Sequence, residues 1–249
     1  GLGDVYKRQI YINTTGHYQG LFGYCPSPSI IKNVKLVSGT VIGKNYIGGI
    51  VSNCNIIIGC VNKANVTGSS SYTGGITGRA LTYCVACENF GEINGGNSAA
   101  GGITGPLSGK MVACVNHGDC IAASSGGMAG PLINNANAAL IACINEGSII
   151  ATGTGGGIAS QLSDYSVDET KELYFVNNAG LFVTKFDFKG QGWNKIGPTT
   201  IPELNSDETI NSLNTAIADW NINNPDYASP YHYAAGGDDN TIPKLVPIE

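Results

Sequence analysis

The chain has 249 residues, of which 36 are glycine and only 12% are charged. This composition indicates many tight turns and few solvated helix faces. The net charge of −5 argues against a nucleic-acid partner, because proteins that bind nucleic acids use basic surfaces to neutralise phosphates. No apolar run reaches the roughly 18 residues that a transmembrane helix needs, so we expect no membrane span.

The first nine residues, GLGDVYKRQ, resemble a translated sequencing adaptor. We therefore treat residues 1–9 as an artefact and leave them out of the fold prediction, as one would an expression tag. We expect the natural N-terminal region to be missing, so a signal for export or anchoring would not be visible in this sequence.

A glycine followed by an aliphatic residue then recurs at intervals of 25 to 30 residues, and such a period indicates a stacked-repeat architecture. The glycines are Gly20, Gly49, Gly75, Gly102, Gly127 and Gly157. The residues that follow them are Leu21, Ile50, Ile76, Ile103, Met128 and Ile158. A further apolar column lies five residues after the glycine, at Cys25, Cys54, Ala80, Leu107, Leu132 and Leu162.

A second block repeats as Cys-x-Asn, beginning at Cys60, Cys87, Cys114 and Cys143. Its asparagines are Asn62, Asn89, Asn116 and Asn145, with Asn177 in a degenerate fifth copy and Asn33 in the matching place of an earlier one. The even positions of the block are constrained, whereas the third varies as Lys63, Phe90, His117, Glu146 and Asn178. A period of two indicates a strand with one buried face, so the varying column is expected to face solvent.

These columns predict an all-β repeat β-solenoid, similar to a parallel β-helix, of about six turns over residues 10–189. Equivalent strands would pair in parallel about 4.8 Å apart, and the asparagines at the bends would hydrogen-bond along the stack. Periodicity alone also allows a stack of separate small sheets, one per repeat.

Residues 190–249 differ in composition and are expected to form a small α/β cap with one short helix. Ser206-Asp207-Glu208 has the character of a helix start, and Asn224-Pro225 that of a helix end. Ile210, Leu213, Ile217 and Trp220 fall on one helical face. We expect this face to cover the last turn of the solenoid near residues 175–182, where an open edge would otherwise aggregate.

The glycine-flanked motifs resemble those of the GLUG-repeat family of bacterial surface proteins. They are clearest in Gly20-Leu21-Phe22-Gly23, Gly75-Ile76-Thr77-Gly78 and Gly102-Ile103-Thr104-Gly105. The tail, with Asp219-Trp220-Asn221, Asn224-Pro225, Tyr231-His232-Tyr233 and Pro243-Lys244-Leu245, is similar to the end segment of such proteins from gut Bacteroidota. The resemblance spans about residues 16–249. It implies an exported, adhesin-like protein at the bacterial cell surface and offers no catalytic residues.

The eight cysteines are expected to be mostly reduced, because they replace buried aliphatic residues in the core columns. Cys25 and Cys54, neighbours in one column, are the pair best placed for a disulfide. Cys84 and Cys87 have the spacing of a metal knuckle or a redox pair. A zinc site needs a second ligand pair, but the sequence has no matching CxxC or HxxxH, and His17, His117 and His232 lie far apart. We therefore expect neither a metal nor a cofactor.

Two acidic residues, Glu92 and Asp119, occupy the same position of successive repeats and should stack on neighbouring turns. A carboxylate pair at this spacing could serve a retaining glycosidase or bind a cation. Like charges at a solvated turn are the commoner explanation.

The functional prediction is a non-catalytic cell-surface module that adheres to or binds its partner through an extended repeat surface. Its partners would be a glycan or a host or bacterial surface protein. Aromatic side chains bind sugars by stacking, and the candidates are Tyr72, Tyr83, Phe90 and Tyr165, each of which could instead pack a turn. The alternatives are a polysaccharide lyase or hydrolase on a β-helix scaffold, or a structural stalk that presents another domain. A lyase or hydrolase would need acids and a base clustered on one face.

Overall fold

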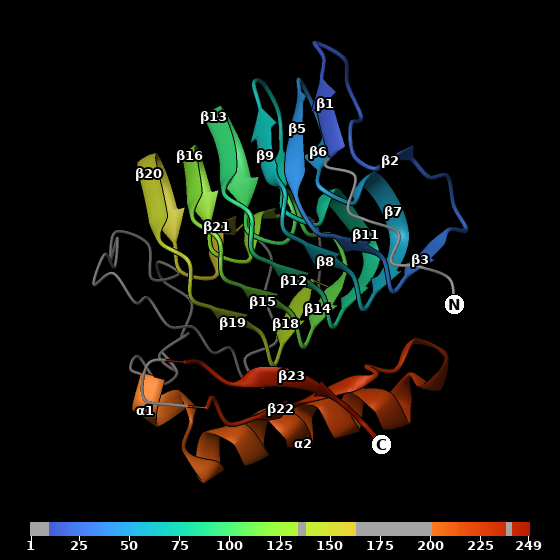
Figure 1. Ribbon diagram of the computed structural model, residues 1–249, viewed down its shortest axis with the longest axis vertical. Helices are drawn as coiled ribbons and strands as arrows, with labels where there is room; N and C mark the ends of the chain where they lie inside the picture. The colour runs from blue at the N-terminus through green and yellow to red at the C-terminus, as the bar shows by residue number, and fades with distance from the viewer. Residues whose placement is uncertain (1–9, 134–137, 163–200, 238–240) are drawn as a thin grey trace, which may run out of the picture.

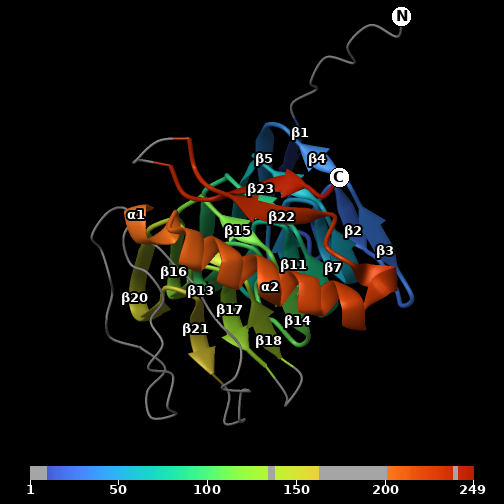
Figure 2. The same ribbon diagram turned by 90° about the horizontal axis from the view of Figure 1, so that it is seen from below.

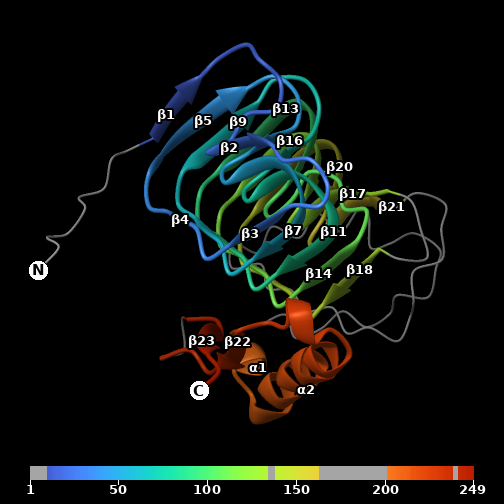
Figure 3. The same cartoon turned by 90° about the vertical axis from the view of Figure 1, so that its right-hand side faces the viewer.

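The computed structural model describes residues 10–133, 138–162, 201–237 and 241–249. The chain winds into a coil in which parallel β-strands of successive turns lie side by side, as Figures 1 and 3 show. Each full turn contributes to three parallel sheets, here called A, B and C. The predicted all-β solenoid is thereby confirmed, and the alternative of separate sheets for each repeat is wrong.

Sheet A comprises β1 (Ile10–Asn13), β5 (Gly39–Gly43), β9 (Asn65–Gly68), β13 (Ile93–Gly101), β16 (Cys120–Gly126) and β20 (Ile149–Gly156), with the short β6 (Ile47–Gly48) and β10 (Thr73–Gly74). Sheet B comprises β2 (Phe22–Tyr24), β3 (Ile30–Lys32), β7 (Val51–Ile58), β11 (Thr77–Val85), β14 (Lys110–Val112) and β18 (Ala139–Ile141). Bridges from β11 continue this sheet to β17 (Ala129–Leu132) and β21 (Ala159–Leu162).

Sheet C is five-stranded, with one strand for each complete turn. Its strands are β4 (Lys35–Leu36), β8 (Val61–Asn62), β12 (Glu88–Asn89), β15 (Val115–Asn116) and β19 (Ile144–Asn145). The described residues therefore hold about five complete turns, and β20 and β21 begin the next one. The prediction of about six turns came from six glycine motifs, the last of which belongs to this incomplete turn.

The register of the strands follows the sequence columns. The aliphatic residues after the glycines are linked by backbone hydrogen bonds of 2.8–3.0 Å, from Ile50 through Ile76, Ile103 and Met128 to Ile158. These five side chains are at most 2% exposed. Leu21, in the same column at the open N-terminal end of the stack, is 38% exposed because no further turn covers it among the described residues.

The asparagines form a continuous side-chain ladder. Nδ2 of Asn62 donates to Oδ1 of Asn89 at 2.8 Å, Asn89 donates to Asn116 at 2.9 Å, and Asn116 donates to Asn145 at 2.8 Å. Each Nδ2 also donates to the backbone carbonyl two residues later in the chain, and this hydrogen bond closes the bend. None of the four asparagines is more than 1% exposed.

One predicted member of the ladder was wrong. Leu36, and not Asn33, pairs with Asn62. Asn33 instead lies at the preceding corner in a left-handed conformation, with φ of 57°, where asparagine is one of the few tolerated residues. Asn177 lies outside the described residues.

The glycine column is packed directly against the asparagine ladder. A Cβ atom added at Gly102 would lie 2.2 Å from Cγ of Asn116, and one at Gly75 would lie 2.3 Å from Cγ of Asn89. No side chain fits at these distances, so the glycine at this position and the asparagine of the second block require each other. The two sequence motifs are one structural unit.

The C-terminal region, residues 201–249, contains α1 (Ile201–Leu204), α2 (Asp207–Asn223), a 3₁₀ helix (Pro225–Tyr227) and the hairpin β22 (Tyr231–Ala234) with β23 (Lys244–Pro247). Helix α2 begins as predicted, with the Ser206 side chain accepting a hydrogen bond from the Thr209 amide at 3.2 Å. It ends at Asn223, with Asn224 as its C-cap before Pro225, also as predicted. Among the described residues, neither helix combines the length and hydrophobicity needed to cross a bilayer.

This region, here called the brace, packs along the side of the described turns of the solenoid. The buried face of α2, with Leu213, Ile217 and Trp220, joins a core of solenoid side chains from four turns: Ile56, Ile58, Val85, Ala86, Val112, Ala113, Val115, Ala142 and Ile144. Figures 1 and 2 show α2 running along the stack across successive turns. The predicted packing of this face against residues 175–182, and the expected boundary at 189/190, fall within residues 163–200, which lie outside the described residues.

The brace fits against a ridge of small residues in left-handed conformation. The ridge comprises Asn33, Gly59, Ala86, Ala113 and Ala142, with φ between 50° and 63°. The three alanines belong to the same buried core as α2. The Tyr233 hydroxyl donates to the carbonyl of Ala142 at 2.8 Å. Small side chains at this sharp corner let the brace approach the backbone, and that approach explains why it lies at the side.

We expect Asn116→Ala to lower the free energy of unfolding by about 3 kcal/mol, because it leaves buried partners on both neighbouring turns without a hydrogen bond. Urea denaturation would measure the change. The matched control is Asn94→Ala, which removes a solvent-exposed bond to the Gly96 amide and should cost much less. Equal losses for the two variants would contradict a stabilising role for the ladder.

We expect Trp220→Ala to destabilise the whole chain by about 3–5 kcal/mol, because a large buried side chain is lost from the interface with the brace. Ile222→Ala, on the same helix at a position that is 77% exposed, is the control. Thermal unfolding followed by circular dichroism should show one cooperative transition at lower temperature. If the helix were lost while the β-sheet transition stayed unchanged, the brace would not stabilise the solenoid.

Candidate functional site

A short ladder of tyrosines runs along one surface of the first turns. The rings of Tyr18 and Tyr46 are stacked with centroids 5.3 Å apart, and those of Tyr46 and Tyr72 are tilted at 5.5 Å. Thr73 pairs with Ala100, so the place of Tyr72 is taken by Ala99 on the next turn. The ladder of rings therefore ends at Tyr72.

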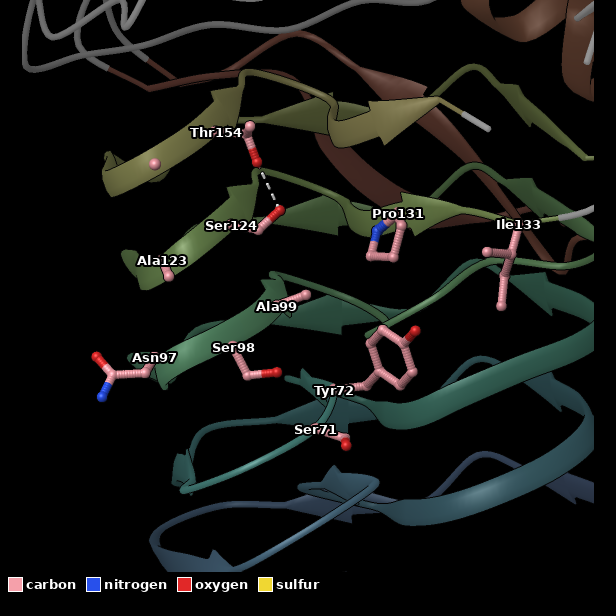
Figure 4. A pocket seen from close by; sticks show the side chains of 11 residues that line it. Ser71, Tyr72, Asn97, Ser98, Ala99, Ala123, Ser124, Pro131, Ile133 and Thr154 are labelled. Atoms are coloured by element: carbon pink, nitrogen blue, oxygen red, sulfur yellow. Dashed lines mark hydrogen bonds between the residues drawn. The ribbon is translucent and has the colours of Figure 1, made fainter. Parts of the chain in front are cut away.

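The same column continues with small side chains. Ala99 pairs with Ser124, and Ser124 with Thr154, on three successive strands of sheet A. Because these residues are much smaller than tyrosine, a groove of about 570 Å³ opens beyond Tyr72. Figure 4 shows Ser98, Ser124 and Thr154 on successive turns, with Tyr72 at one end of the groove.

The groove offers one aromatic surface, a row of neutral polar groups and a small apolar wall. Its lining comprises Ser71, Tyr72, Asn97, Ser98, Ala99, Ala123, Ser124, Pro131, Ile133, Gly153 and Thr154. The Thr154 hydroxyl donates to that of Ser124 at 2.7 Å, and each oxygen keeps a free lone pair for a ligand. None of these lining residues carries a carboxylate, an imidazole or an amine. The site is suited to a neutral ligand with many hydroxyl groups.

The sequence named Tyr72 as an aromatic candidate but did not indicate the other residues of this column. The signal was present, because Tyr46, Tyr72, Ala99, Ser124 and Thr154 each lie three residues before the motif glycine. A column that changes from large aromatic to small polar residues predicts a groove in the surface, but only if the column is known to face outward.

Phe90 belongs to a different surface, in the column predicted to face solvent. It is 41% exposed, Lys63 Nζ lies 4.8 Å from its ring centroid, and the His117 ring stacks on it at 4.2 Å. His117 in turn contacts Glu146 through Nδ1, and its Nε2 lies 3.6 Å from Oε2 of Glu88. The varying residues thus form a contiguous stack of opposite charges and rings along sheet C.

The pKa of His117 is raised above its ordinary value. Burial by itself would lower it, but the hydrogen bond and negative charge of Glu146, together with those of Glu88, outweigh this effect. The two ring nitrogens face different carboxylates, so this group does not converge on a common ligand atom. Its arrangement is that of an ion-pair stack that stabilises the solenoid surface.

The other two aromatic candidates are not part of the groove. Tyr83 packs against Trp220 and Tyr227 of the brace, with ring centroids 5.1 and 5.2 Å apart, so it belongs to an internal interface. Tyr165 lies outside the described residues. Of the four predicted ligand-binding aromatics, the structure places one, Tyr72, at a concave surface.

Glu92 and Asp119 occupy the same corner on neighbouring turns, as predicted, because Ile93 pairs with Cys120. Oδ1 of Asp119 accepts a hydrogen bond from the Ser148 amide at 2.9 Å. At the same corner, Oδ1 of Asn65 accepts from the Glu92 amide at 3.0 Å. The side chains at this corner serve to fasten one turn to the next, which favours the structural interpretation of the acidic pair.

All eight cysteines are free thiols, in agreement with the predicted reduced columns, and this includes Cys25 and Cys54. Three of them, Cys84, Cys87 and Cys114, are close enough to ligate one ion: their sulfur atoms lie within 4.8 Å of one another. The sequence spacing of Cys84 and Cys87 did not indicate this group, because its third member, Cys114, comes from the next turn of the solenoid.

No family model, curated protein or solved structure matches the chain.

The stability contributed by His117 should depend on pH. Because its pKa is raised in the folded state, the contribution is complete below about pH 6.5, the ordinary value for an unfolded histidine. It is lost as the pH rises through the raised folded-state pKa. We expect the difference in unfolding free energy between the wild type and His117→Gln to shrink as the pH rises above about 6.5 and through the raised pKa of the folded state. Glu146→Gln should weaken this pH dependence, and an unchanged difference across the range would contradict the ion-pair stack.

Proposed function

We propose that the protein is a non-catalytic binding module that holds a neutral glycan in the groove beside Tyr72. The observation that supports this most is the column three residues before the motif glycine. Its stacked tyrosines end at Tyr72, and a groove lined by hydroxyl and amide groups follows. Sugars combine apolar ring faces with many hydroxyls. They therefore match an aromatic ring flanked by uncharged donors and acceptors.

The shape of the groove favours a chain-like ligand. Its polar residues repeat once per turn along the stack, at Ser98, Ser124 and Thr154 (Figure 4). A ligand made of similar units could meet the same kind of group on each turn. Binding across several turns fits the extended surface that repeat proteins offer.

The lining also favours binding over turnover. Glycoside cleavage requires a pair of carboxyl groups at the scissile bond, or a base and an acid in a lyase. The groove residues supply neither. Exposure at the bacterial cell surface, which the resemblance to GLUG-repeat proteins implies, is part of the same proposal.

The proposal is tested by binding of the chain to a panel of plant, mucin and bacterial polysaccharides, followed by calorimetry on any that bind. We expect Tyr72→Ala to weaken binding about tenfold, the effect of losing about 1.4 kcal/mol of ring contact. Ser124→Phe, which extends a large side chain into the groove, should abolish binding. Phe90→Ala is the control, since this exposed ring lies on another surface.

Binding that survives both groove substitutions would place the ligand elsewhere and overturn the proposal. Release of reducing ends or of unsaturated sugars by the wild type would overturn its non-catalytic part. Binding without turnover, reduced at Tyr72 and Ser124, is the result that supports it.

A further inference from the structure

Three cysteine side chains converge in the solenoid core, away from the groove. Cys84 lies near the end of β11, and Cys87 follows it after the left-handed corner at Ala86. Cys114 holds the place of Cys87 on the next turn, since Glu88 pairs with Val115. All three sulfur-bearing side chains are 0% exposed.

Their spacing is that of a three-coordinate metal site. Three sulfur atoms at about 2.3 Å from a central ion stand about 4.0 Å from one another in a plane. Sγ of Cys84 and Sγ of Cys114 are 3.9 Å apart, and all three sulfur atoms lie within 4.8 Å of one another. Small side-chain rotations would complete the triangle without moving the backbone ladder.

We propose that Cys84, Cys87 and Cys114 bind a single soft monovalent ion, Cu(I), in the core of the solenoid. The expectation of no metal relied on the lack of a second ligand pair in the sequence, whereas stacking supplies the third ligand from the neighbouring turn.

The surroundings favour Cu(I) over the harder divalent ions. The thiols lie in a core of hydrocarbon and sulfur that includes Ile57, Leu107 and the thioether of Met111, whose residue pairs with Cys84. Soft sulfur ligands select Cu(I), which accepts three of them. Zinc in a structural site takes a fourth ligand, but among the described residues no fourth thiol, including Cys60 and Cys143 of the same core, lies within 4.8 Å of all three sulfur atoms. Carboxylate-bound ions need oxygen ligands.

Binding is an exchange of protons for the ion. Burial raises the pKa of the Cys114 thiol well above its ordinary value, and this thiol donates to the Cys84 carbonyl at 3.4 Å. Cu(I) held by two thiolates and one neutral thiol displaces two protons and leaves one net negative charge. The Cys87 amide, 3.4 Å from Sγ of Cys114, donates toward that charge. Copper enters and stays in the +1 state, so no electron is transferred.

Because the sulfur atoms have no contact with solvent, the ion must enter while the chain folds or opens locally. The experiment therefore refolds the full chain without oxygen in the presence of Cu(I) stabilised by acetonitrile, followed by desalting. We expect one copper per chain by elemental analysis, sulfur-to-copper charge-transfer absorption in the near ultraviolet, and an X-ray absorption shell of three sulfur atoms. Affinity should rise with pH as protons are released.

Cys84→Ala and Cys114→Ala should each lower copper affinity at least tenfold. Cys120→Ala is the matched control, because Cys120 is equally buried but belongs to a separate core cluster. Cys25→Ser tests the partly exposed thiol and should retain copper.

Copper absent from the refolded wild type, or retained equally by the Cys84 and Cys114 variants, would overturn the proposal. Loss of copper in Cys25→Ser would assign the copper to the partly exposed thiol of Cys25, and this result would also overturn the proposal. If the core variants fail to fold, the absorption shell of the wild type decides: three sulfur atoms support the site, whereas two sulfurs or any nitrogen or oxygen ligand contradict it.

Discussion

The structure depends on the contact between the asparagine ladder and the glycine column. A buried amide needs all of its hydrogen bonds, and Asn89 and Asn116 obtain theirs from the bend of their own turn and from the amides of adjacent turns. The side chain reaches this position only because Gly75 and Gly102 present bare backbone to it. A change on either side would bury an unsatisfied amide or create a clash, so the two motifs keep the same period along the chain.

This constraint leaves other columns free to vary, and the candidate function lies in one of them. The residue three positions before the motif glycine has no role in the ladder, so it can change from Tyr46 and Tyr72 to Ala99, Ser124 and Thr154 without disturbing the turns. The groove is the result of that change on a regular scaffold. A repeat fold can in this way create a local concave site on an otherwise even surface.

Different sides of the solenoid have different roles. The ridge of left-handed residues at Ala86, Ala113 and Ala142 carries only methyl groups and is covered by the brace, which ties four turns together through α2 and Tyr233. The groove is lined by other residues, none of which belongs to this interface. The interior of the solenoid gathers thiols, because cysteine fits the narrow core column as a small apolar side chain.

The sequence by itself determined the solenoid, its columns, the reduced cysteines and the bounds of α2, because each depends on residues that recur at a fixed period or on local capping. It also predicted the shared corner of Glu92 and Asp119. Only the tertiary structure decided where the brace lies, that Tyr83 is covered by it, and that Cys114 joins Cys84 and Cys87. These three outcomes depend on contacts between residues about 30 or more positions apart, and no local pattern encodes which side of a turn a later segment will pack against.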